Sequence, residues 1–229
     1  EPVSVGETEF EVRFRGDGRQ IVAGSPVLLA VSAYDGRYGT NLRESGAPAL
    51  VVGTADPSSI GASLTDIVLG QTEGSRLVVA RQLSSGETEI NVVDVLYSIA
   101  KGTPVETQDG PLTVTATEQG ITVTPGSGEP PTDLTIQVLL QGTGPQVAPG
   151  DQVVAQYLAG GWSDGAVSSS TWEEGTPRTI DLQAAWPGIR EALVDHRVGS
   201  RLAITIPPEK ATGEDTMCIV VDILGTVPQ

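Results

Sequence analysis

The sequence contains one cysteine, one histidine and one methionine among its 229 residues, and only 4% of its residues are aromatic. The lone cysteine, Cys218, excludes an internal disulfide and a cluster of thiolate metal ligands. It lies in the apolar run MCIVVDIL, so we predict a small buried hydrophobic residue there. No apolar run approaches the roughly 20 residues that a membrane-spanning helix needs.

Positive charge is also scarce, with 13 Lys and Arg against 29 Asp and Glu and a formal net charge of −16. A phosphate backbone would repel such a surface, which excludes nucleic acid as a partner. The carboxylates are scattered, without a calcium-loop pattern or the His and Cys spacing of a metal site, so we expect no metal and no cofactor. The acidic excess favours solubility, with an attraction to basic partner segments as a minor alternative.

Internal repetition is what the chain has in abundance. GSRLVVA at 74–80 recurs as GSRLAIT at 199–205, and INVVDVL at 90–96 recurs as CIVVDIL at 218–224. Residues 11–31 and 137–157 both read as a strand, a Gly-x-Gly turn and a second strand. Because these matches come in the same order in both halves, they predict a duplicated domain.

Each half shows apolar residues with period two, which predicts an antiparallel sheet. One short helix is expected per half, near residues 60–70 and 186–197. In the second, Trp186, Ile189 and Leu193 share one stripe, with Pro187 in the first turn and Gly199 as the C-terminal stop. The predicted fold class is therefore α+β, with two tandem domains, each a bent antiparallel sheet wrapped on one short helix.

The composition changes over residues 101–135, where Pro, Gly and Thr replace aliphatic residues. Residues 113–124 alternate enough for a short strand or hairpin, and GSGEPP at 126–131 is typical of an extended spacer. We place the domain boundary between residues 104 and 105. The second domain, 105–229, then carries this segment at its N-terminal end.

The second half resembles the FKBP-type peptidyl-prolyl isomerases, in the exported tandem form of Gram-positive actinobacteria. The resemblance rests on GDQVVAQY at 150–157, SSTWEEGTP at 169–177 and PGIREALVDHRVGSRLAITIPPE at 187–209. It implies a five-stranded sheet around a short helix, with an apolar, aromatic-lined pocket between them. Such a pocket favours a twisted prolyl amide, whose rotation otherwise faces a barrier of roughly 18–20 kcal/mol.

Most pocket aromatics of that family are replaced in this chain. The resemblance assigns six positions to a degenerate substrate pocket: Tyr157, Ser169, Trp186, Ile189, Thr212 and Ile219. Of these, Tyr157 retains the family's aromatic residue, and Ile189 stands where the family has its floor tryptophan. The family's Phe-Asp pair falls on Ser168 and Ser169. In the first domain Val31 and Leu64 occupy the tyrosine and tryptophan positions, and we expect no pocket there.

Two further motifs have structural explanations. GWSDG at 161–165 fits the G-x-S-x-G pattern of hydrolase nucleophiles, but Asp164-Gly165 indicates a hairpin turn rather than a strand-to-helix elbow around Ser163. A nucleophilic serine would depend on His196, the single histidine. We place His196 in the last turn of the predicted helix, where it interacts favourably with the helix dipole. The adhesion tripeptide at 15–17 falls in a turn between strands.

These observations leave two function classes. The first is an extracytoplasmic binding or accessory module of the cell envelope, with weak or no isomerase activity and no assigned catalytic residue. The second is an active isomerase or chaperone for exported proteins. The expected partners are proline-containing exported polypeptides or a membrane-protein complex. We expect an envelope location, with a lipid anchor on a cysteine upstream of Glu1 tying the chain to the outer face of the plasma membrane.

Overall fold

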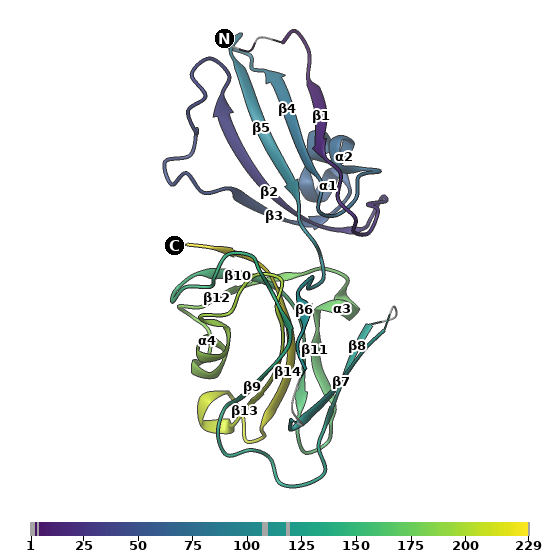
Figure 1. Cartoon of the computed structure of the whole chain (residues 1–229), viewed down its shortest axis with the longest axis vertical. Coiled ribbons are helices and arrows are strands. Elements are labelled where there is room, and N and C mark those ends of the chain that lie inside the picture. Colours follow the sequence, from purple (N-terminus) through teal and green to yellow (C-terminus); the bar gives the residue numbers. More distant parts are fainter. Residues whose placement is uncertain (1–2, 4, 107–109, 118–119, 229) are drawn as a thin grey trace. The chain divides into compact units, whose positions relative to one another are not determined.

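The computed structural model describes residues 3, 5–106, 110–117 and 120–228. The chain forms two compact units, one ending at Ser98 and the other beginning at Ile99 (Figure 1). The short strand β6, Thr103–Pro104, pairs with a strand of the second unit. Residues just before the predicted boundary at 104 therefore belong to the second sheet.

The first unit is an antiparallel sheet of five strands with two short helices. Its elements are β1 (Glu9–Phe14), β2 (Pro26–Asp35), β3 (Ala49–Thr54), α1 (Pro57–Ile60), α2 (Ala62–Val68), β4 (Arg76–Gln82) and β5 (Thr88–Val95). The strands lie in the order β1-β4-β5-β2-β3. Ile67 and Val68 of α2 pack with Leu29, Leu77 and Val93 from the sheet to form its core.

The second unit contains the remaining elements. After β6 come β7 (Leu112–Thr117), β8 (Gly120–Pro125), β9 (Thr135–Gln141), β10 (Gln152–Gly161), β11 (Val167–Ser170), α3 (Thr171–Glu174), β12 (Arg178–Asp181), α4 (Pro187–Leu193), β13 (Arg201–Ile206), the 3-10 turn η1 (Pro208–Lys210) and β14 (Met217–Val227). The path β9-β13-β14-β10 continues to β12. This order reproduces that of the first unit, strand for strand.

The register of the two sheets also agrees. Val31 of β2 lies opposite Val93 of β5, and Tyr157 of β10 lies opposite Val221 of β14. These are the positions that the sequence repeat aligns. The predicted α+β class, with bent antiparallel sheets on short helices in two tandem domains, is therefore confirmed.

The helices differ in detail from the prediction. Helix α2 falls within the expected residues 60–70, whereas α1 was not predicted. The side chain of Asp56 caps α1 by accepting hydrogen bonds from the N–H groups of Ser58 and Ser59. None of the helices in the described part of the chain is long and apolar enough to cross a membrane.

The prediction of a helix over 186–197 was too long, because α4 ends at Leu193. Val194 is extended and Asp195 has a φ of 69°, which no helix accommodates. His196 therefore lies beyond the helix rather than in its last turn. Gly199, with a φ of 94°, is not the helix stop, and instead lies against Gly142 at the entrance to β13.

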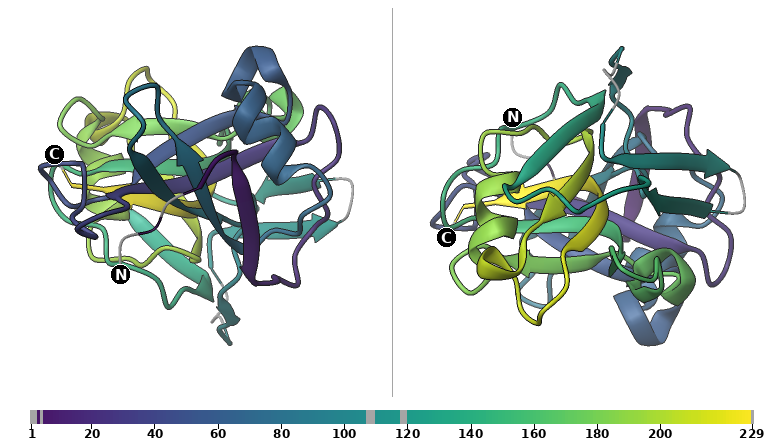
Figure 2. Two further views of the ribbon diagram at one scale, coloured as in Figure 1. Left: turned by 90° about the horizontal axis from the view of Figure 1, so that it is seen from above. Right: turned by 90° about the horizontal axis from the view of Figure 1, so that it is seen from below.

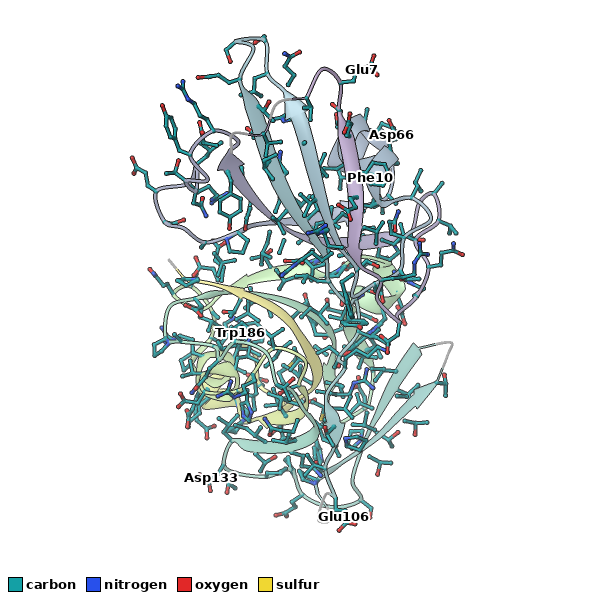
Figure 3. The ribbon with its side chains drawn as sticks, turned by 45° about the horizontal axis from the view of Figure 1, so that its top comes forward. Glu7, Phe10, Asp66, Glu106, Asp133 and Trp186 are labelled. Carbon is teal, nitrogen blue, oxygen red and sulfur yellow. The ribbon has the colours of Figure 1, made fainter. Side chains whose placement is uncertain are left out.

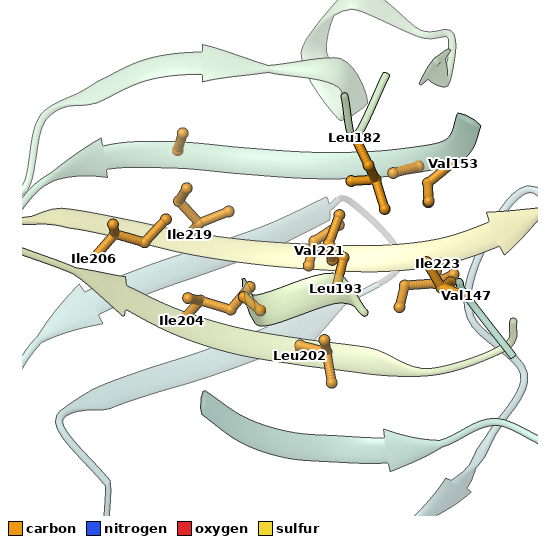
Figure 4. Packing of buried hydrophobic residues seen from close by; sticks show 13 residues of the cluster. Val147, Val153, Leu182, Leu193, Leu202, Ile204, Ile206, Ile219, Val221 and Ile223 are labelled. Atoms are coloured by element: carbon orange, nitrogen blue, oxygen red, sulfur yellow. The ribbon is translucent and has the colours of Figure 1, made fainter. Parts of the chain in front are cut away.

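The core of the second unit lies between its sheet and α4 (Figure 4). Leu193 and Ala192 of the helix meet apolar residues that alternate along β13 and β14, including Leu202, Ile204 and Ile223. Each of these large side chains is fully buried, which stabilises the unit by about 1.5–3 kcal/mol per side chain. The helix is short, so its position depends on this packing rather than on its own propensity.

The opposite face of this sheet is covered by the hairpin β7–β8, which stands as a separate two-stranded ribbon (Figure 2). Leu112 and Ile121 of the hairpin are buried against Ala203, Cys218 and Val220. The predictions of a hairpin at 113–124 and of a buried Cys218 are confirmed. Residues 126–131 that follow contain neither helix nor strand.

Candidate functional site

A pocket of about 280 Å³ opens between α4 and the sheet of the second unit. Its lining combines residues from four strands, α4 and the segment before it: Tyr157, Ala159, Ser168, Ser169, Ile180, Ala185, Trp186, Ile189, Leu193, Met217, Ile219 and Val221. Apart from the phenol of Tyr157, none of these side chains can ionise. The site can therefore hold an uncharged apolar group, and the polar side-chain groups of its lining are the hydroxyls of Tyr157, Ser168 and Ser169 and the indole N–H of Trp186.

Strand periodicity explains how β14 supplies one wall. Met217, Ile219 and Val221 point into the pocket, because alternate residues of a strand face the same side. The residues between them, Cys218 and Val220, point to the opposite face and pack under the hairpin. A single strand thus separates the pocket from the hairpin core.

Helix α4 supplies the floor through Ile189 and Leu193. Gly188 lets the helix approach β13 closely, since a Cβ there would lie 2.3 Å from Cγ2 of Ile206. Trp186, labelled in Figure 3, is the N-cap residue of α4, lines the pocket and remains 37% exposed. Its indole is the largest aromatic surface of the site.

Another wall comes from β11. Polar contacts from β11 and from Thr171, the first residue of α3, hold it against β10. Oγ of Ser168 donates a hydrogen bond of 3.1 Å to the carbonyl oxygen of Ala159. Oγ1 of Thr171 accepts a hydrogen bond of 2.8 Å from the N–H of Tyr157 and donates one of 2.5 Å to Oε1 of Gln156. These bonds hold the backbone around Tyr157 in place.

The structure brings five of the six residues named from the sequence into this pocket: Tyr157, Ser169, Trp186, Ile189 and Ile219. Thr212 does not line the pocket and is exposed in the segment after η1. The sequence reasoning missed Met217 and Val221, although the period of two along β14 places both on the same face as Ile219. It also missed Ile180 and Ala185, for which the sequence carries no comparable signal.

The first unit does not repeat this apolar lining. Its strand registers place Arg81, Glu89 and Asn91 where the second unit has Ile206, Met217 and Ile219. An oxygen of Glu89 forms an ion pair of 2.9 Å with Arg81 and accepts a hydrogen bond of 2.7 Å from Asn91. The corresponding face is thus polar.

The structure also explains the other sequence motifs. Ser163 lies in the turn between β10 and β11, and its Oγ donates a hydrogen bond of 2.8 Å to Asp215. This geometry is not that of a nucleophile elbow. The bonds from Ser163 hold the pKa of Asp215 below its usual value.

Asp17 of the adhesion tripeptide accepts a hydrogen bond of 2.6 Å from the hydroxyl of Tyr97. This bond is the main reason why the pKa of Tyr97 is raised to about 12. Within the described residues, no group of three or more His, Cys, Asp or Glu side chains lies close enough together to hold a metal ion.

Fold and site together define a class of protein in which an antiparallel sheet and a short helix enclose an apolar pocket. The family model described as FKBP-type peptidyl-prolyl cis-trans isomerase matches residues 144–219. An FK506-binding protein of Streptomyces anulatus is 34% identical over 89 residues, covering 38% of this chain and 72% of that protein. A probable FK506-binding protein of Corynebacterium glutamicum is 28% identical over 107 residues, covering 43% of this chain and 91% of that protein.

This chain belongs to the FKBP-type peptidyl-prolyl isomerase family. Among solved structures, FkpA from Escherichia coli matches with a TM-score of 0.40 and 25% identity. That match covers 50% of this chain and 52% of the other, about half its length.

Proposed function

We propose that this protein is a protein-binding or accessory module of the cell envelope, located outside the cytoplasm, whose second domain has weak or no peptidyl-prolyl isomerase activity. One observation carries this proposal: the pocket is intact and apolar, but its floor is Ile189 instead of the family's tryptophan, and serines replace aromatic contact at β11. The site therefore keeps a surface for binding while losing aromatic contacts to a prolyl ring.

The loss of these contacts sets the expected activity. An aromatic contact contributes about 0.5–1.5 kcal/mol beyond the area it buries. Two missing contacts then raise the barrier by about 1–3 kcal/mol, which is roughly 5–150-fold in rate. The floor and the β11 side of the pocket are where these two contacts are missing.

The test is an isomerisation assay of the full chain on tetrapeptides with a central X-Pro bond. The Streptomyces FK506-binding protein, measured under the same conditions, provides the reference. We expect kcat/KM roughly 5–150-fold below that reference, together with suppression of the aggregation of an unfolded client protein. A kcat/KM equal to the reference would overturn the proposal of a weak enzyme.

The alternative is an active isomerase for exported proteins. Two features favour it: Tyr157 is retained, and the Trp186 indole lies at the edge of the pocket. In that case the indole contacts the prolyl ring from the side instead of from below. Trp186→Ala should then abolish isomerisation, whereas a weak enzyme would show no further loss.

The envelope location rests on the acidic composition with a single cysteine. We propose a lipid anchor on a cysteine upstream of Glu1, and docking onto a membrane-protein complex or onto proline-containing exported polypeptides. Extraction of envelope membranes with mild detergent tests both parts. Stoichiometric recovery with a membrane complex supports docking, whereas recovery from the cytosol alone contradicts the location.

A further inference from the structure

The size of the pocket exceeds what a prolyl ring fills. A dry cavity of about 150 Å³ in another protein accommodates benzene, a larger ring than that of proline. The pocket here has a volume of about 280 Å³, and Ile189 forms part of its lining. A bound prolyl ring would leave much of this volume to water and would forfeit contacts with the walls.

The chemistry of the lining selects among larger side chains. The pocket walls are aliphatic apart from Tyr157, Trp186 and two serine hydroxyls. A charged side chain would lose its hydration there without gaining an ionic partner, which is costly. A Phe, Leu or Met side chain instead gains about 1.5–3 kcal/mol when fully buried.

The charges beside the pocket determine which residues of a bound polypeptide are favoured next to the inserted side chain. On the bordering segments 167–181, 187–193 and 207–216, Arg178 forms an ion pair of 2.8 Å with Glu174, and Lys210 forms one of 2.7 Å with Glu191. Arg190 is the one remaining cation of these segments. The carboxylates that form no ion pair there are Glu173, Asp181, Glu209, Glu214 and Asp215. These segments therefore carry a net negative charge.

The second unit as a whole agrees with this local charge. Residues 99–229 contain sixteen Asp and Glu against six Lys and Arg. A field of one sign attracts segments of the opposite charge and raises their rate of association. Basic residues beside the inserted side chain would thus meet a complementary surface.

We propose that the pocket of the second unit binds one large uncharged side chain, Phe, Leu or Met, of an extended polypeptide flanked by Lys or Arg, without requiring proline. The inference rests on the proposed binding function and names its ligand class. It also explains how the site stays useful without the family's indole: the deeper floor at Ile189 admits a longer side chain.

The test measures binding of acetylated, amidated heptapeptides KKAXAKK to the full chain by calorimetry, with X as Phe, Leu, Pro or Ala. We expect the Phe and Leu peptides to bind about 10-fold more tightly than the Pro peptide, because more apolar surface is buried. The peptide EEAFAEE should bind more weakly than KKAFAKK, and the difference should shrink in 1 M salt.

A floor variant provides the second arm of the experiment. Ile189→Trp should fill the pocket, weaken binding of the Phe peptide and narrow or reverse its advantage over the Pro peptide. Ala185→Phe, at a half-buried position on the pocket edge, should have the same effect and replaces Ile189→Trp in the experiment if that variant fails to fold. Leu42→Trp, at an exposed site in the first unit, is the matched control and should change nothing.

Each outcome decides the inference. Equal or tighter binding of the Pro peptide to the wild-type chain overturns the proposed ligand class but leaves the pocket as a protein-binding site. Binding of none of the peptides removes both this inference and the proposed binding function. A preference for Phe that Ile189→Trp leaves unchanged places binding outside the pocket and also overturns the inference.

Discussion

Arg201 and Asp222 form a two-point ion pair on neighbouring strands of the second unit. Nε and Nη2 of the arginine lie 2.6 Å and 2.8 Å from the two carboxylate oxygens, and the aspartate side chain is completely buried. The N–H of Ala100 donates a further bond of 2.8 Å to the same carboxylate. The first unit has the equivalent pair Arg76–Asp94, with side chains 57% and 28% exposed. The repeat thus places one chemical pair in two environments.

We expect Arg201→Met to destabilise the second unit by about 3–5 kcal/mol, because a buried carboxylate loses its partner. Arg76→Met is the matched control and should cost the first unit only about 0–1 kcal/mol, since water screens its exposed pair. All three tryptophans lie in the second unit, so tryptophan fluorescence in urea follows its unfolding, while circular dichroism follows the whole chain. Equal losses for the two variants would show that burial does not decide the strength of this pair.

Cys218 reports on the hairpin β7–β8. Burial raises the pKa of its thiol to about 11, with Asp215 adding to the effect. Because the thiolate is the reactive form, a thiol reagent at pH 8 should modify the folded chain at least roughly 100-fold more slowly than the unfolded chain. Ile121→Asp should speed the reaction by loosening the hairpin that covers the thiol.

Thr122→Asp is the control for that substitution, since Thr122 is the neighbouring residue on the exposed face of the same hairpin. It adds the same charge without disturbing the buried contact. The two rates are compared by mass spectrometry at fixed times. Equal acceleration by both variants would contradict the role assigned to Ile121.

The stability of the second unit should fall as the pH drops below about 6.5, the pKa of an unperturbed histidine. Burial lowers the pKa of His196 in the folded chain, against the opposing charge of Asp195. The unfolded chain therefore binds more protons in the range between the two pKa values, and stability decreases with acidification there. His196→Gln should flatten this dependence in urea unfolding followed by tryptophan fluorescence between pH 7.5 and 5.5.

Asp195→Asn gives the opposite change. It removes the charge that supports protonation of His196, so the loss of stability on acidification should become steeper. Asn tolerates the positive φ of 69° at this position, which keeps the backbone unstrained. A pH dependence identical in wild type and His196→Gln would assign the effect to other groups.

The pocket should bind an uncharged apolar dye such as Nile red, and Met217→Glu should weaken that binding at least about 10-fold by placing an unpaired charge in the lining. Thr212→Glu is the control, because Thr212 is exposed and does not line the pocket. Dye fluorescence titrations compare the two variants. Equal weakening by both would place Thr212 at the site, as the sequence alone suggested.

The family resemblance located much of the candidate site. Tyr157, Trp186, Ile189 and Ile219 could be named because the resemblance assigns each of them a position in the pocket. Ile180 could not, since β12 reaches the pocket only by pairing with β10 far along the chain. The end of α4 was also not predicted. Asp195 adopts the left-handed conformation there, and the sequence has no glycine at this position to indicate it.

The sequence by itself determined the duplicated fold, because strand periodicity and ordered glycines are local properties that survive the divergence of the two halves. Through the family resemblance it also predicted that the apolar pocket between sheet and helix lies in the second half. Only the tertiary structure decided which face each strand presents to that pocket and which face the hairpin covers. It likewise decided that one Arg–Asp pair is buried and the other exposed. These properties depend on contacts between residues distant in sequence. The burial that such contacts produce sets how much each ion pair and each apolar side chain contributes to stability.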